Sequence, residues 1–332
     1  MLKPTNYLLL LALWVAFIQM AFGQQKLRIV ASASMIADIA TNIVGNGQSI
    51  ETLVPVGGDP HLHEPTPSNA RQVAEADLIL INGLTFEGWI TELIENSGTD
   101  AQVITATQGI DVLSSSTYAN SADPHAWMDA SNGILYATNI ANALIELDPL
   151  EEDSYLRNLS AYTDRLNKLD TEIAAMVSTI PASQRVLVTS HDAFQYFGRR
   201  YGIRLEAIMG ISTEAEAQTA DIRRVSRAIR ESNIPAIFIE STINPKLIQQ
   251  IAQDNGVAIG GKLYADSLGD EKSEASTYID MLRYNAETIV EALSSNDGLV
   301  EAPRQSFSWL LYMAVGVLMI ICTLVFVRMM QS

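Results

Sequence analysis

The chain has 332 residues, enough for about two globular domains and far too many for a small disulfide scaffold. Hydrophobic residues make up 48% of it and charged residues 18%, which excludes an intrinsically disordered protein. Residues 24–303 carry 18 basic and 38 acidic side chains, a net charge of −20. This balance excludes binding to nucleic acid through its phosphates and favours the attraction of cations.

Residues 1–23 are predicted to be a secretory signal peptide. Lys3 precedes an apolar run from Tyr7 to Phe22, and small residues lead to a cleavage position near Gly23. An uncleaved membrane helix is the alternative, although the run is short for one. Under either interpretation the rest of the chain is exported.

A first α/β lobe is predicted over residues 24–149. Short β-branched runs predict strands at 27–32, 49–54, 77–81 and 102–105. Apolar residues at helical spacing predict helices at 35–44, 68–76 and 86–96. Because strands and helices alternate, we expect a mostly parallel sheet.

Residues 150–180 are predicted to be a connecting helix, because the segment is long, charged and free of Gly and Pro until Pro181. A surface helix of one large domain is the alternative. A second α/β lobe is expected over 181–296, with strands at 185–189, 204–207, 236–239 and 257–259 and helices at 193–201, 217–230, 245–254 and 277–293.

The C-terminal end is predicted to anchor the protein in a membrane. Residues 309–327 are almost entirely apolar and long enough to span a bilayer, and residues 297–308 form a tether to them. Arg328 favours a cytoplasmic C-terminus, which agrees with an exported body. A buried core helix is the alternative. The chain's one cysteine, Cys322, lies in this run, so a metal site in the body must use His, Asp or Glu.

Three histidines indicate a metal site at the edge of the sheets. His61 and His125 each end an Asp-Pro-His sequence in a loop, and His191 follows a predicted strand. Ligands bind at the carboxyl ends of parallel strands, so these imidazoles are expected to converge there. For each one alone, a solvated loop histidine is the competing interpretation.

Carboxylates can complete this site. Asp266, just past the last strand of the second lobe, offers a fourth ligand for a divalent ion, although such an Asp is often only a turn residue. Glu240, at the end of another strand, is expected to support a ligand imidazole by hydrogen bonding. His63 is a possible substitute for His61, ranked below it, because residues i and i+2 share a face in an extended segment.

Five segments together resemble the zinc/manganese solute-binding proteins of ABC importers, in particular the TroA-like branch of periplasmic metal-binding proteins. They are Asp-Pro-His at 59–61, Asp-Pro-His-Ala-Trp at 123–127, Thr-Ser-His-Asp-Ala-Phe-Gln-Tyr-Phe at 189–197, Ala-Ile-Phe-Ile-Glu-Ser at 236–241 and Tyr-Ala-Asp-Ser-Leu at 264–268. The resemblance covers residues 27–295 in order. It implies two lobes joined by a long helix, with the metal held between them by His61, His125, His191 and Asp266.

In two respects the chain departs from this family. No cysteine lies near the signal for lipid attachment, so the C-terminal helix is expected to serve as the anchor. Residues 114–121 lack the His- and Asp-rich loop of many zinc-specific members, which puts metal scavenging by such a loop in doubt.

The resemblance implies that the protein captures a divalent metal, Zn²⁺ first and Mn²⁺ next, and hands it to an ABC permease driven by its ATPase. We expect a monomer that is not an enzyme, exported and anchored in the cytoplasmic membrane with its body outside. A surface-anchored metal-dependent hydrolase, with Glu64 or Glu240 as general base, is the main alternative, and a structural metal in an adhesion module is a third.

Overall fold

The computed structural model describes residues 26–45, 48, 50–114, 121–214, 217–232 and 234–294. The predicted signal peptide (1–23), tether (297–308) and transmembrane helix (309–327) lie outside these residues. Within the described part of the chain, no helix combines the length and apolar character needed to cross a membrane.

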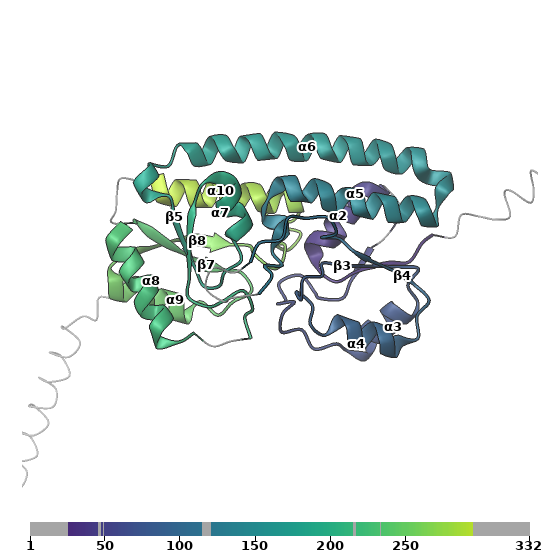
Figure 1. Ribbon diagram of the computed structural model, residues 1–332, viewed down its shortest axis with the longest axis horizontal. Helices are drawn as coiled ribbons and strands as arrows, with labels where there is room; N and C mark the ends of the chain where they lie inside the picture. Colours follow the sequence, from purple (N-terminus) through teal and green to yellow (C-terminus); the bar gives the residue numbers. More distant parts are fainter. Residues whose placement is uncertain are drawn as a thin grey trace, which may run out of the picture.

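The first lobe is built on one four-stranded sheet. Its strands are parallel, in the order β2-β1-β3-β4, and they are β1 (Ile29–Ala31), β2 (Ile50–Thr52), β3 (Leu78–Ile81) and β4 (Gln102–Thr105). The helices α3 (Pro67–Ala74) and α4 (Ile90–Ser97) lie below this sheet in Figure 1, and α2 (Ser34–Val44) and α5 (Ala130–Leu147) lie above it.

The central strands of this sheet are buried on both faces. Ile29 and Leu80 join the large core beneath α2 and α5, whereas Val30 and Ile79 join a smaller core with α3 and α4. Successive side chains of a strand point to opposite faces, so a continuous apolar run is what a sheet covered on both sides requires.

The second lobe repeats this plan with two parallel strand pairs. One pair is β5 (Val186–Thr189) with β6 (Arg204–Ala207), the other is β7 (Ala236–Glu240) with β8 (Ala258–Leu263), and β5 lies beside β7. The surrounding helices are α7 (Gln195–Tyr201), α8 (Thr219–Ser232), α9 (Lys246–Asn255) and α10 (Tyr278–Ser294). The predicted α/β class with parallel sheets is therefore confirmed.

One long helix, α6 (Glu152–Ser178), runs along both lobes (Figure 1). Its 27 residues correspond to about 40 Å of helix. Buried side chains along one face, including Tyr162, Leu169 and Ile173, pack it against α2, α5 and α10. The same hydrophobic core continues from the first lobe through α6 into the second. A shared core of this kind resists large independent motion of the two lobes.

Two helices differ from the expectation. The helix predicted over 86–96 begins only at Ile90, because the preceding loop turns through Leu84 and Thr85, whose φ angles are 54° and 63°. The 18-residue helix α5 is not among the predicted elements. Its first turn includes Gly133, where a Cβ atom would lie 2.8 Å from the Tyr278 hydroxyl, so packing requires the poor helix former.

Candidate metal centre

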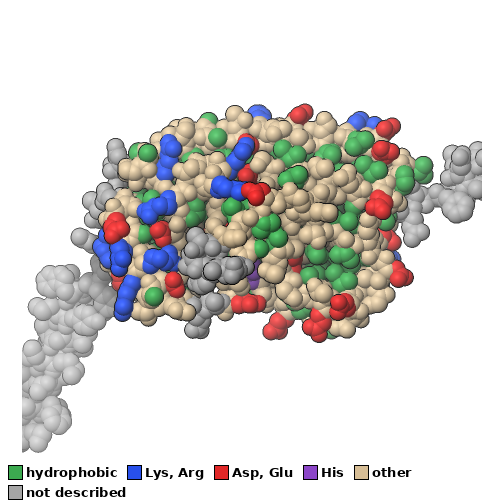
Figure 2. Space-filling view, viewed as in Figure 1, with side chains coloured by type: hydrophobic (Ala, Val, Ile, Leu, Met, Phe, Trp, Pro, Cys, Tyr) green, Lys and Arg blue, Asp and Glu red, His purple; other side chains and the backbone are tan. Residues whose placement is uncertain are grey.

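Four side chains from both lobes meet between the first lobe and the second. His61 lies in the loop after β2 and His125 in the loop after β4, whereas His191 follows β5 and Asp266 follows β8. All four positions come after the carboxyl end of a strand, which is where parallel α/β sheets bind ligands. Figure 2 shows histidine at the boundary between the lobes.

The facing atoms of this cluster are close enough to share one ion. The Nε2 atoms of His61 and His125 are 3.3 Å apart, and Nε2 of His125 lies 3.4 Å from Oδ1 of Asp266. Nε2 of His191 lies 3.2 Å from Oδ2 of Asp266. One ligand atom from each of the four residues falls within 4.8 Å of all the others. Three imidazole nitrogens and one carboxylate oxygen make a donor set suited to a tetrahedral zinc site.

The two Asp-Pro-His sequences form the same local turn. Oδ1 of Asp59 accepts a hydrogen bond from the backbone N–H of His61 at 2.9 Å, and Oδ1 of Asp123 accepts one from His125 at 3.0 Å. Aspartate favours this bond to the backbone two residues on, and it fixes where the following histidine leaves the loop.

Carboxylates orient two of the imidazoles. Nδ1 of His125 lies 2.8 Å from Oδ1 of Asp123, and Nδ1 of His191 lies 2.6 Å from Oε2 of Glu240. Glu240 also accepts the backbone N–H of His191 at 2.9 Å. A carboxylate on one ring nitrogen leaves the other free to face a metal and increases its basicity. Glu240 therefore lies in contact with His191, and its role in supporting a ligand stays a prediction.

Buried aromatic rings surround the cluster. The Phe86 ring meets the His61 ring edge-on at 4.9 Å, and the Trp127 ring lies 5.3 Å from that of His125. The Trp127 indole N–H donates to the backbone carbonyl of Ala265 at 3.0 Å, which fixes the chain next to Asp266. His125, His191 and Asp266 are at most 1% exposed and His61 is 7% exposed, so water has little access to the ligand atoms.

The protonation states of the ligands differ because their surroundings differ. Burial lowers the pKa of His61 to about 3, although the charge of Asp266 opposes it. Burial acts in the same direction on His125, but hydrogen bonds to Asp123 and Asp266 outweigh it and raise its pKa to about 9. The pKa of His191 is likewise raised well above its usual range, because Glu240 and Asp266 overcome burial.

Asp266 is ionised in this environment. Burial alone would raise its pKa, but the charge of His191 and the nearby ring of His125 hold it well below the usual range. Even so, within the described residues neither carboxylate oxygen has a hydrogen bond of good geometry, and neither does Nε2 of His191. Buried polar atoms without partners are costly, and a divalent cation among these atoms would satisfy them.

A cation also suits the wider electrostatic field. Residues 24–149 contain 3 basic and 15 acidic side chains, whereas residues 181–296 contain 12 and 15. Figure 2 shows Lys and Arg gathered mainly over the second lobe. The acidic charge of the first lobe raises the local concentration of cations around the protein.

His63 does not join the cluster. Its Nε2 lies 3.2 Å from Oδ1 of Asn69, and its ring packs on Trp89 at 4.8 Å. Glu64 is exposed and also lies outside the four-residue group. The loop turns His63 toward Asn69 of α3, away from the cluster, so spacing in an extended segment did not predict its direction.

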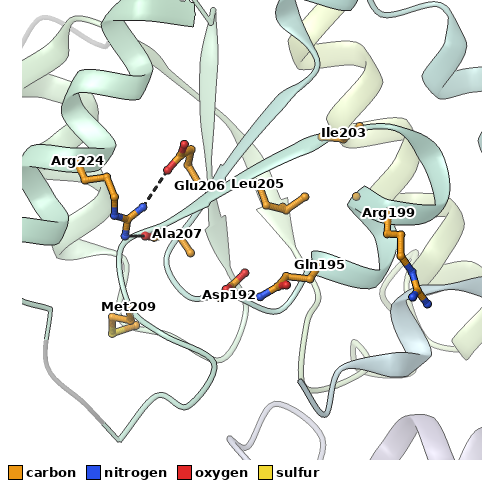
Figure 3. Close-up of a pocket in the computed structure, with 10 residues that line it drawn as sticks. Asp192, Gln195, Arg199, Ile203, Leu205, Glu206, Ala207, Met209 and Arg224 are labelled. Atoms are coloured by element: carbon orange, nitrogen blue, oxygen red, sulfur yellow. Dashed lines mark hydrogen bonds and ion pairs between the residues drawn. The ribbon is translucent and has the colours of Figure 1, made fainter. Parts of the chain in front are cut away.

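A separate cavity of about 440 Å³ lies on the other side of Asp192 (Figure 3). The arginines that line it are already paired. Arg224 contacts Glu206 at 2.9 Å, and Arg199 contacts Asp111 at 2.7 Å. Because their charges are satisfied within the protein, the unsatisfied histidine cluster remains the candidate site.

Sequence reasoning missed several residues of the site. The repeated Asp-Pro-His sequence could have indicated Asp123, because an aspartate two residues before a histidine can reach its backbone and ring. Phe86 and Trp127 carried no comparable signal. Folding brings the Phe86 ring from another segment to His61, whereas Trp127 contacts the ring of His125 two residues before it.

The family model described as zinc-uptake complex component A, periplasmic (ZnuA), matches residues 29–292 of this chain. The chain belongs to this family. Manganese ABC transporter substrate-binding lipoprotein PsaA of Streptococcus pneumoniae is 36% identical over 280 residues, covering 82% of this chain and 90% of the relative. Manganese-binding lipoprotein MntA of Halalkalibacterium halodurans is 38% identical over 270 residues, covering 81% and 89%.

A solved structure of the periplasmic zinc binding protein TroA from Treponema pallidum is similar over 81% of this chain and 100% of that chain. Its TM-score is 0.77 and its sequence identity 33%. The family resemblance read from the sequence is thus confirmed. The comparisons give no support to the hydrolase alternative, because PsaA is described as a substrate-binding lipoprotein of an ABC transporter and MntA as a manganese-binding lipoprotein.

Proposed function

We propose that this protein captures a divalent transition metal outside the cytoplasm and delivers it to an ABC permease for import. The metal is its cargo, held by His61, His125, His191 and Asp266. The observation that supports this proposal most strongly is that both lobes contribute possible ligand atoms to one buried cluster. The relatives' descriptions as substrate-binding proteins of metal ABC transporters support the same role.

Zinc is the tighter-bound cargo in this proposal, with manganese next. Three imidazole nitrogens and one carboxylate make a nitrogen-rich donor set, and zinc ranks well above manganese for such ligands. The descriptions of relatives include both metals, zinc for TroA and manganese for PsaA and MntA. Our order of preference follows from the donor set.

A hydrolase would need an open coordination position for water and a free general base. Four protein ligands close a tetrahedral site. Glu240, one of the two candidate bases, already contacts His191 through both of its oxygens, and Glu64 lies outside the cluster. These contacts favour binding over catalysis.

Export and membrane attachment complete the proposal. The relatives described as lipoproteins, and the family described as periplasmic, support an exported protein that is held at a membrane. We propose that residues 1–23 direct export and that residues 309–327 anchor the body beside the permease.

Metal uptake by cells tests this function. Cells that lack the protein should accumulate less zinc or manganese from metal-limited medium, and the wild-type gene should restore uptake. A His191→Ala variant should not restore it, because the ligand set is broken. His63→Ala is the matched control, since this histidine contacts Asn69 instead of the cluster. Uptake restored equally by His191→Ala would contradict the proposal.

A further inference from the structure

The three imidazoles differ in how their orientation is fixed. Nδ1 of His125 lies on Asp123 and Nδ1 of His191 lies on Glu240, at 2.8 and 2.6 Å. The described part of the chain offers the His61 ring no such carboxylate. Its ring contacts are Nε2 of His125 and the edge of Phe86. The position of His61 therefore depends on the backbone of its loop.

Asp59 ties that loop to the opposite lobe. One carboxylate oxygen accepts the backbone N–H of His61 at 2.9 Å, and the other accepts the hydroxyl of Thr213 at 2.7 Å. Thr213 belongs to the second lobe, 154 residues away. A single carboxylate thus couples the position of His61 to a side chain of the second lobe.

The loop that carries Thr213 is fixed at its base to the residues that flank His191. The backbone N–H of Met209 donates to the carbonyl of Ser190 at 2.9 Å, and the N–H of Asp192 donates to the carbonyl of Gly210 at 3.1 Å. Figure 3 shows Met209 below Ala207, the last residue of β6, and Asp192 on the separate segment that follows β5. Thr213 therefore links the loop of His61 to the backbone around His191.

We propose that Thr213 is a positioning residue that holds His61 at the metal and slows release of the ion. The inference rests on the proposed function, because it assumes that the cluster binds a metal. Without the Thr213 hydroxyl, the loop still has, among the described residues, the bond from the N–H of Gly57 to the Ser267 hydroxyl of the second lobe at 2.7 Å. That bond lies four residues before His61, so the imidazole gains freedom to leave while the other three ligands stay in place.

Zinc release from the full chain tests this role. The protein is loaded with Zn²⁺ alone, an excess of chelator is added, and the dissociation rate constant is followed by stopped-flow fluorescence of a zinc indicator. Thr213→Val keeps the shape of the side chain and removes the hydroxyl, so release should become at least about tenfold faster, as expected for loss of a bond to a charged acceptor. Thr213→Ser keeps the hydroxyl and should release zinc close to the wild-type rate.

Thr171→Val is the matched control, because its hydroxyl donates within α6 to the carbonyl of Asn167. It should leave the release rate unchanged. A purely structural role for Thr213 would instead lower the melting temperature of the metal-free protein without changing release. If Thr213→Val does not fold, Thr213→Ala removes the same hydroxyl for the same comparison.

Two results would overturn the inference. The first is wild-type release from Thr213→Val, which leaves the proposed function intact. The second is equally fast release from Thr213→Val and Thr213→Ser, since the hydroxyl would then be irrelevant. If the wild-type protein binds no zinc, the proposed function is contradicted, and the proposed role of Thr213 is contradicted as well.

Discussion

Metal binding should release protons, because two of the proposed ligands are positively charged imidazolium groups in the metal-free protein at neutral pH. Hydrogen bonds to Asp123 and Asp266 raise the pKa of His125 to about 9, and Glu240 and Asp266 raise the pKa of His191 well above its usual range. Only neutral imidazole coordinates a metal, so the ion must displace both protons. His61, with a pKa lowered to about 3, is already neutral at pH 7 and releases no proton when the metal binds.

The size of this effect follows from the shift. With a pKa of about 9, His125 is about 99% protonated at pH 7, which weakens the apparent affinity about 100-fold relative to the neutral ring. The raised pKa of His191 adds a dependence of the same sign. The affinity for the metal therefore increases as the pH rises toward 9. When two protons are displaced, it increases by about 100-fold per pH unit. Imidazoles with an ordinary pKa near 6.5 would instead give an affinity that levels off above pH 7.

Isothermal titration calorimetry measures both quantities. Zinc titrations at pH 7 in buffers with different ionisation enthalpies should give about two protons released for each ion bound. The apparent dissociation constant, measured by chelator competition from pH 6 to pH 8, should fall throughout that range. Release of no protons, together with an affinity that is flat above pH 7, would refute the assigned protonation states of His125 and His191.

Three further predictions concern the same site. Zinc at 100 times its dissociation constant should stabilise the native protein by about 2.7 kcal/mol, so chelator-stripped protein without a metal-dependent shift in thermal melting would contradict the site. Glu240→Gln should weaken zinc binding about 10- to 100-fold in competition titrations, because the amide supports His191 less well, and unchanged affinity would deny Glu240 that role. His191→Glu should narrow the preference for zinc over manganese, because a carboxylate oxygen favours manganese. A ratio of dissociation constants that stays unchanged or moves toward zinc would mean that His191 is not a ligand.

Much of the fold could be predicted because its strands are short apolar runs between helices. Strands such as Leu78–Ile81 and Val186–Thr189 are buried on both faces, so their composition distinguishes them from the surrounding amphipathic helices. Helix α5 was not predicted, because its sequence does not distinguish it clearly from a loop. Its sequence near Asn132 and Gly133 has weak helix propensity, and packing against α10 compensates for it.

Some residues of the candidate site could likewise be proposed from the sequence, whereas others could not. The sequence could propose His61, His125, His191 and Asp266 as a group because each lies in a segment that follows a strand, and the folded structure brings the four together. The choice between His61 and His63 depended on how one loop turns, which local spacing cannot give. The contacts of Phe86 and Thr213 join segments far apart in the chain, so only the folded structure contains them.

The central claim is that one metal ion is held by ligands from both lobes. A crystal structure of the zinc-loaded protein, with anomalous diffraction recorded on both sides of the zinc absorption edge, tests it most directly. We predict one zinc ion bound by Nε2 of His61, His125 and His191 and by the carboxylate of Asp266, at about 2.0–2.2 Å from each. An anomalous peak bound by His63, or by residues of one lobe alone, would contradict the account.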